Sequence, residues 1–315
     1  MMRKNDVISF MILFLSTTVF IFAELIPLPL TVEADDKKVQ LGKKLFLDPI
    51  LSKDKSISCL SCHKLLENGA DNIPYTEGIR GQKGGFNSPT VYNAVYNFRQ
   101  FWDGRAKNLT EQALMPVINP VEMGNTIEQV LQDLKAEKVY RDMFNEIFKD
   151  GITENNLAEV LVEFEKKLIT PNAPFDKYLR GDKKALNAQA QLGYELFKTK
   201  GCISCHNGIN LGGNLYNKFG IYKDAKSIEL GRYNQTQKDE DKYVFKVPSL
   251  RNVDITAPYM HDGRVETLED AVNIMTKYQL GRPMDSDDLK NLVAFLKTLT
   301  GELPDIVKDI NATHK

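Results

Sequence analysis

The sequence is poor in several residue types, and each scarcity restricts what the protein can be. Its 315 residues include only four cysteines, four histidines and one tryptophan. Lys and Arg total 41 against 42 Asp and Glu, so the chain has no basic surplus with which to displace the counterions of a nucleic acid. Glycine (20) and proline (13) are too few for a collagen-like or low-complexity chain, and 42% of the residues are hydrophobic. These figures exclude nucleic acid as a partner and indicate a globular protein long enough for two domains.

Long apolar runs are also lacking, except near the N-terminus. Residues 7–23 carry no charge, follow Arg3 and Lys4, and are separated from an acidic stretch by the small residues around Ala34. A basic, then apolar, then small-residue order is typical of a secretory signal. We therefore predict a signal peptide over 1–34, cleaved near Ala34, and a periplasmic protein. The run is close to the length of a membrane span, so an uncleaved N-terminal anchor is the competing interpretation.

All four cysteines lie in two identical C-x-x-C-H frames. The first consists of Cys59, Cys62 and His63, and the second of Cys202, Cys205 and His206. Zinc ribbons set their cysteine pairs about 15 to 20 residues apart, far closer than these, and a redox dithiol gives no reason for a histidine after both pairs. In the haem c frame, two thiols add to the vinyl groups and the adjacent imidazole ligates the iron. The sequence predicts two covalently bound haem c groups.

The haem frames belong to a longer internal repeat. Each is preceded by a helical segment that contains Gln-Leu-Gly and Leu-Phe, at 40–46 and 191–197, and followed by a proline turn and an Asp-Gly-Arg triplet, at 103–105 and 262–264. Apolar residues from 128 to 168 recur at helical spacing with a break at Gly151, and no segment alternates like a strand. We predict a mainly α fold of two cytochrome c-like haem domains related by duplication, 35–170 and 181–300, with a tail at 301–315.

The sixth ligand of each iron separates an electron carrier from a catalyst, because only an iron with an open face binds peroxide. Besides the frame histidines the chain has only His261 and His314, so a methionine downstream of the second frame is the candidate for the second iron. The candidates are Met260, Met275 and Met284, although a methionine on a helix is more often a core residue.

Several segments resemble the bacterial di-haem cytochrome c peroxidases. They are 87–93 (NSPTVYN), 100–106 (QFWDGRA), 109–113 (LTEQA), 119–123 (NPVEM), 271–281 (AVNIMTKYQLG) and 294–301 (AFLKTLTG). Together they extend over nearly the whole mature chain in the order of the family. The resemblance implies that Met275 is the axial partner of His206, with Met260 in reserve. It also implies an enzyme that reduces hydrogen peroxide with electrons from a small soluble c-type cytochrome or cupredoxin.

The resemblance further implies roles for three residues near the first haem. Glu122 would take a proton from the bound peroxide and return one to the departing oxygen, and Gln112 would orient the peroxide. Trp102 would lie between the haems on the route of the electrons. Without the family motifs these would be a surface carboxylate, a solvated helix residue and a core tryptophan.

The family also implies a calcium ion between the domains and a homodimer. Asn87 would offer its side-chain oxygen to the calcium ion, and Thr256 and Pro258 their backbone carbonyls, all hard ligands of the kind calcium prefers. The same residues could form ordinary turns.

The chain departs from many members of the family in the loop 76–86. Ile79 stands where those members carry a histidine that caps the first iron, and neither Ile79 nor the permanently protonated Arg80 has a lone pair to offer. We therefore expect the first haem to be open in the resting oxidised protein. Two alternatives stay open. One is a MauG-like enzyme that oxidises residues of a partner protein, whose second haem carries tyrosine in place of Met275, with Tyr278 nearby. The other is a di-haem electron carrier without catalysis.

Overall fold

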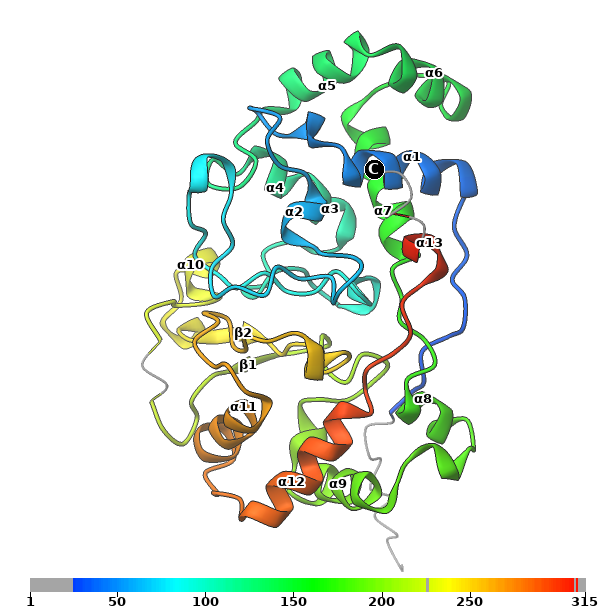
Figure 1. The fold of residues 1–315 in the computed structure, drawn as a ribbon. Helices are drawn as coiled ribbons and strands as arrows, with labels where there is room; N and C mark the ends of the chain where they lie inside the picture. The colour runs from blue at the N-terminus through cyan, green and yellow to red at the C-terminus, as the bar shows by residue number, and fades with distance from the viewer. Residues whose placement is uncertain (1–24, 225–226, 309, 311–315) are drawn as a thin grey trace, which may run out of the picture.

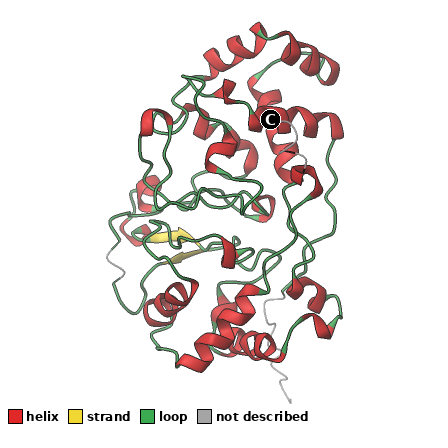
Figure 2. Ribbon diagram, in the orientation of Figure 1, coloured by secondary structure: helices red, strands yellow, loops and turns green. Residues whose placement is uncertain are grey.

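The computed structural model describes residues 25–224, 227–308 and 310, so most of the predicted signal peptide lies outside the described part. Helices and connecting loops make up nearly all of it (Figures 1 and 2), which confirms the mainly α prediction. The helices are α1 (Asp36–Leu47), α2 (Cys59–Cys62), α3 (Leu109–Ala113), α4 (Met115–Ile118), α5 (Ile127–Ala136), α6 (Lys138–Ile147), α7 (Glu154–Lys166), α8 (Pro174–Leu179), α9 (Ala188–Thr199), α10 (Tyr233–Thr236), α11 (Leu268–Ile274), α12 (Ser286–Lys297) and α13 (Asp305–Lys308). A short antiparallel pair, β1 (Tyr216–Lys218) and β2 (Val244–Lys246), was not predicted.

Each half of the molecule is built on one pair of closely packed helices, α1 with α7 and α9 with α12. The repeated glycine allows this approach in both halves. A Cβ on Gly42 would lie 1.9 Å from the carbonyl oxygen of Val160, and a Cβ on Gly193 would lie 1.9 Å from that of Asn291. No other residue type fits without moving a backbone. The Gln-Leu-Gly repeat of the sequence therefore marks the same helix contact twice.

The N-termini of the long helices are capped by side chains. Asp35, Thr153, Asn187 and Asp285 each accept a hydrogen bond from a backbone N–H of the first turn of α1, α7, α9 and α12. Such caps satisfy donors that have no partner within the helix. The predicted break at Gly151 separates α6 from α7, whereas the break between α5 and α6 was not predicted.

The two halves meet at a pair of equivalent asparagines. Asn93 and Asn252 have left-handed backbones (φ +63° and +62°), and their side-chain amides donate to the same hydroxyl, Thr170 Oγ1, at 2.8 and 3.0 Å. Their backbone N–H groups donate to the carbonyls of Leu168 and Leu299, at 2.8 and 3.1 Å. The internal repeat thus extends to the contact between the two halves, where the hydroxyl of Thr170 accepts a hydrogen bond from the equivalent asparagine of each half.

Both ends of the described chain pass between the two halves (Figure 1). Leu25 belongs to the apolar core of the second half, and from there the chain runs to α1 in the first half. Leu28 is fully buried on the way. Beyond residue 300, Val307 and Ile310 join the apolar core of the first half. Among the described helices, none has the length and apolar character needed to span a membrane.

Candidate active site

The first haem frame occupies α2, a single helical turn. The backbone N–H of Ser58 donates to Ser61 Oγ at 3.0 Å, which closes the start of the turn. His63 follows directly, and its Nδ1 lies 3.1 Å from the carbonyl oxygen of Gly69. Because a carbonyl can only accept, Nδ1 carries the proton and Nε2 keeps its lone pair. Burial lowers the pKa of His63 to about 4, so the imidazole is neutral and suited to ligate iron.

The second frame repeats this geometry. Residues 202–204 form a 3₁₀ turn, and the Nδ1 of His206 lies 3.3 Å from the carbonyl oxygen of Leu211. Burial lowers the pKa of His206 to about 4 as well. None of the four cysteines forms a disulfide, so all four sulfurs remain available for thioether bonds. The chemistry of both frames therefore fits covalent haem c.

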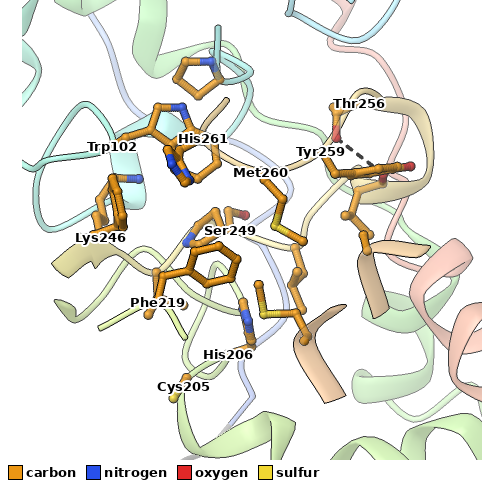
Figure 3. Close-up of a pocket in the computed structure, with 18 of the residues that line it drawn as sticks. Trp102, Cys205, His206, Phe219, Lys246, Ser249, Thr256, Tyr259, Met260 and His261 are labelled. Carbon is orange, nitrogen blue, oxygen red and sulfur yellow. Dashed lines mark hydrogen bonds between the residues drawn. The ribbon is translucent and has the colours of Figure 1, made fainter. Parts of the chain in front are cut away.

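A large cavity opens above the second frame. Cys205 and His206 lie at one end of it, and Trp102, Lys246 and His261 lie at the other (Figure 3). The walls come from both halves of the chain, because the segment around Trp102 belongs to the first half. The cavity thus extends from the second haem frame to the boundary between the domains.

Two of the three candidate methionines line this cavity, Met260 and Met275. Met275 begins a π-helical turn, 275–279, that continues α11, and such turns are frequent at functional sites. Tyr278 is not among the lining residues. Its carbonyl accepts a hydrogen bond from the backbone N–H of Tyr222 at 2.9 Å, and the ammonium of Lys223 lies 5.3 Å from the centre of its ring.

Trp102 is held firmly in the wall of the cavity. Its indole Nε1 donates to the carbonyl of Asn87 at 2.9 Å, and its own carbonyl accepts from the backbone N–H of Lys246 at 2.8 Å. Its ring meets His261 edge-on, with 6.3 Å between the centroids. His261 is buried, stacks on Phe245 at 4.3 Å, and has a pKa lowered to about 4, chiefly by burial. The sequence showed His261 only as one of two histidines outside the haem frames, and nothing in it indicated this aromatic cluster.

Glu122 lies close to the first frame. Its charge acts on the Cys62 thiol, whose pKa rises to about 12 chiefly because the thiol is buried. The carboxylate accepts a hydrogen bond from Asn119 Nδ2 at 2.6 Å. Burial raises the pKa of Glu122, and Arg105 and Asn119 only partly offset this. A half-buried carboxyl with a raised pKa is suited to proton transfer.

The loop that contains Ile79 is hydrogen-bonded to the backbone of Glu122. The backbone N–H of Ile79 donates to the carbonyl oxygen of Glu122 at 2.8 Å, and its buried side chain lies against Gly124. Gly78 has no room for a side chain, since a Cβ would lie 2.1 Å from the carbonyl oxygen of Val121. Ile79 is therefore fixed against the backbone of the 122–124 segment, which carries the predicted catalytic residue.

The other predicted site residues fall into two groups. Gln112 lies on α3, half-buried, and no hydrogen bond of its side chain is found within the described residues. Asn87, Thr256 and Pro258 line one cavity, the same one that contains His206. The Nδ2 of Asn87 donates to the carbonyl of Ile73 at 2.8 Å, and no hydrogen bond to its Oδ1 is found within the described residues. Thr256 Oγ1 donates to the carbonyl of Val253 at 3.4 Å, the dashed line in Figure 3.

Comparisons with known proteins agree with this geometry. A family model described as di-haem cytochrome c peroxidase matches residues 36–184, and one described as cytochrome c matches 190–300. The chain is 47% identical over 269 residues to a cytochrome c551 peroxidase of Nitrosomonas europaea, with 84% of this chain and 80% of the relative covered. It is 48% identical over 277 residues to the cytochrome c551 peroxidase of Pseudomonas aeruginosa, with 85% and 80% covered.

A solved structure shares the fold at lower sequence identity. It is the crystal structure of a MauG-like protein associated with microbial copper homeostasis, with a TM-score of 0.79 and 25% identity. The match covers 91% of this chain and 95% of that chain. The fold of this chain therefore also occurs in a protein of known structure.

Proposed function

Because the chain belongs to the family of bacterial di-haem cytochrome c peroxidases, which carry two haem c groups and reduce hydrogen peroxide, we propose that its two haem sites divide the reaction. Peroxide reacts at the site of Cys59, Cys62 and His63, and electrons arrive at the site of Cys202, Cys205 and His206. When bound, the first haem supplies the iron that breaks the oxygen–oxygen bond and the second supplies the electrons. One peroxide, two electrons and two protons yield two waters.

The observation that carries this assignment is the half-buried carboxyl of Glu122 beside Cys62. As a carboxylate it accepts the proton of the peroxide oxygen that approaches the iron. As an acid it returns that proton to the departing oxygen, so that water leaves instead of hydroxide. Burial raises the pKa of Glu122 toward the pH at which the enzyme works, which favours both steps. Asn119 holds the carboxyl in one orientation through the 2.6 Å hydrogen bond.

Gln112 assists by orienting peroxide. Its amide is not engaged by another side chain of the described part, so it is free to donate to one peroxide oxygen and accept from the other. Steady-state turnover of the Gln112→Leu variant tests this role, since the loss of one positioning contact raises KM more than it lowers kcat.

The first site is open in the resting oxidised enzyme. Ile79 occupies the loop position of the capping histidine, and the contact between its N–H and Glu122 keeps this loop in place. No reductive release of a ligand is then needed before peroxide enters. The absorption and EPR spectra of the ferric protein as isolated test this directly, because a wholly low-spin first haem would contradict it. Ile79→His should convert the first haem to the low-spin form.

At the second site Met275 supplies the sixth ligand. It lines the same cavity as His206 and begins the π-helical turn, which supports it over Met260, although both line the cavity. Trp102 stands between the two sites, and its hydrogen bonds at both the indole and the carbonyl support a fixed place on the path of the electrons. Met275→Leu should abolish the spectrum of a His/Met low-spin haem, whereas Met260→Leu should preserve it.

The MauG-like alternative is not favoured by the second site. A relative named MauG, from Methylorubrum extorquens, is 33% identical to this chain, against 47% and 48% for the two cytochrome c551 peroxidases. Tyr278, the nearest candidate for a tyrosine ligand, does not line the cavity and lies near Lys223 instead. Steady-state assays with peroxide and a reduced c-type cytochrome separate the peroxidase from the two alternatives. Rapid oxidation of the cytochrome identifies a peroxidase, and its absence would indicate a partner-protein oxidase or a carrier.

A calcium ion between the domains fits the residues at the boundary. No cluster of three or more His, Cys, Asp or Glu side chains suited to a metal occurs in the described part, so the site would use neutral oxygens. Asn87 Oδ1 and the carbonyls of Thr256 and Pro258 are of that kind, and they line one cavity. Chelation followed by calcium titration, with activity and haem spectra as readouts, tests the site.

The oligomeric state, the location and the electron donor of the enzyme can each be measured. We expect a periplasmic homodimer that takes electrons from a small soluble c-type cytochrome or cupredoxin. Sedimentation at equilibrium measures the oligomeric state, and fractionation of expressing cells measures the location. Competition between candidate donors in the steady-state assay identifies the physiological class.

A further inference from the structure

Lys246 is a buried cation without a counter-charge. It ends β2, is only 7% exposed, and its ammonium makes no hydrogen bond or ion pair with any described residue. Burial alone lowers its pKa to about 8. An ammonium taken out of water without an anion is strongly disfavoured, so such a residue normally has a partner. The described part of the chain does not supply one.

Other cations at the same cavity are accounted for. The buried guanidinium of Arg251 lies 2.9 Å from a carboxylate oxygen of Asp176 and also donates to the carbonyls of Ile209 and Ile26. Lys218 lines the cavity from β1 but is exposed to water. Among the basic residues lining this cavity, Lys246 alone is both buried and unpaired within the described chain.

The position of Lys246 indicates what its partner is. Cys205 and His206 lie at one end of the cavity and Lys246 lies at the other, beside Trp102 (Figure 3). In haem c the vinyl-derived thioethers and the two propionates are on opposite edges of the porphyrin. A haem attached at Cys205 would therefore direct its carboxylates away from the cysteine and toward the part of the cavity that Lys246 lines.

We propose that Lys246 is the counter-ion of a propionate of the second haem. This rests on the proposed attachment of that haem at Cys202, Cys205 and His206. The backbone of Lys246 donates to the carbonyl of Trp102 at 2.8 Å, so one short strand links the propionate to the tryptophan between the two sites. Lys246 is thus a positioning residue. It holds the haem edge toward Trp102, and its charge favours the reduced form of the haem.

Three variants of the holoenzyme test the pairing. Lys246→Met removes the charge, Lys246→Gln removes the charge but keeps a polar end, and Lys246→Arg keeps the charge. Lys242→Gln is the matched control, because Lys242 is an exposed lysine just before β2 that pairs with Asp239. Each protein is titrated spectroelectrochemically, and absorption and EPR distinguish the His/Met haem from the first haem.

Loss of a positive charge near the porphyrin favours the ferric state. At a fixed applied potential, we expect the ratio of reduced to oxidised second haem to fall on the order of tenfold in Lys246→Met and Lys246→Gln, from the Coulomb energy of charges about 10 Å apart at an effective dielectric constant of about 20. Lys246→Arg should restore most of the ratio, and Lys242→Gln should leave it unchanged. If the Lys246→Met protein does not bind the second haem, the ratio measured in Lys246→Gln tests the pairing instead.

Two results would overturn the inference. One is a wild-type ratio in Lys246→Gln, and the other is an equal change in the first haem. Peroxide turnover by the wild-type enzyme tests the proposed function separately. A chain that binds both haems but does not reduce peroxide would refute the function, while the titrations would still decide the role of Lys246.

Discussion

The role of Glu122 gives the sharpest test of the reaction. Glu122→Gln replaces a carboxyl with an amide of the same shape, and the amide oxygen can still accept the 2.6 Å hydrogen bond from Asn119. The substitution therefore preserves the packing around the half-buried side chain and removes only its ability to carry a proton. General acid–base catalysis is worth about 100 to 10,000-fold, so we expect kcat/KM for peroxide to fall by that factor. This corresponds to about 3 to 5 kcal/mol of activation free energy.

The assay follows the oxidation of a reduced c-type cytochrome at varied peroxide concentration. Glu128→Gln is the matched control, because Glu128 is an exposed carboxylate in the first turn of α5. It should stay within about twofold of the wild type, as surface substitutions usually do. Pyridine haemochrome spectra should show two haems per chain in both variants. A Glu122→Gln enzyme within threefold of the wild-type rate would refute the reasoning.

The pH profile adds a second readout. In the free enzyme Glu122 must be ionised to accept a proton, so kcat/KM falls as the pH drops through its pKa, which burial raises above the ordinary 4.5. Glu122→Gln should lack this acid limb. Because the hydrogen bond from Asn119 lowers the pKa of Glu122, Asn119→Ala should move the limb to higher pH. An acid limb that persists in Glu122→Gln would belong to another group.

Three further predictions follow from the described contacts. Trp102→Phe keeps an aromatic ring but loses the 2.9 Å hydrogen bond to the carbonyl of Asn87. Stopped-flow spectroscopy should show slower electron transfer between the haems in this variant. An unchanged rate would mean that the electrons take another route. Burial raises the pKa of Glu165 to about 8, above its unfolded value, so the folded protein loses stability as the pH rises from 4.5 to 8. Glu165→Gln should remove this loss, on the order of 4 kcal/mol, in thermal unfolding at pH 8. Leu28 is fully buried in the fold, which argues against the cleavage near Ala34 that the sequence predicts. We therefore expect cleavage before Leu28, and a mature mass corresponding to a start at Asp35 would contradict this.

The local features of this protein could be predicted from its sequence. The two C-x-x-C-H frames form single turns followed by histidine, and the repeated Gln-Leu-Gly segments form α1 and α9, each with its glycine against a partner helix. In both halves a helix, α3 or α11, begins shortly after the Asp-Gly-Arg triplet of the repeat. These features depend on residues that are neighbours along the chain, where spacing alone determines which side chains share a face.

Other features depend on the tertiary structure, because burial is set by segments far apart in sequence. Nothing in the sequence around Lys246 distinguishes it from the other lysines, and its burial becomes evident only when β2 is placed against Trp102, more than a hundred residues away. The same holds for Leu28, which reads as part of a leader but is buried against Asp176, its backbone N–H donating to that carboxylate at 3.1 Å. The amino-acid pattern determined which haem chemistry this chain can perform. The folded arrangement decided which charges are buried, because burial depends on segments far apart in the sequence, and the energetic cost of an unpaired buried charge is the physical basis of the partner proposed for Lys246.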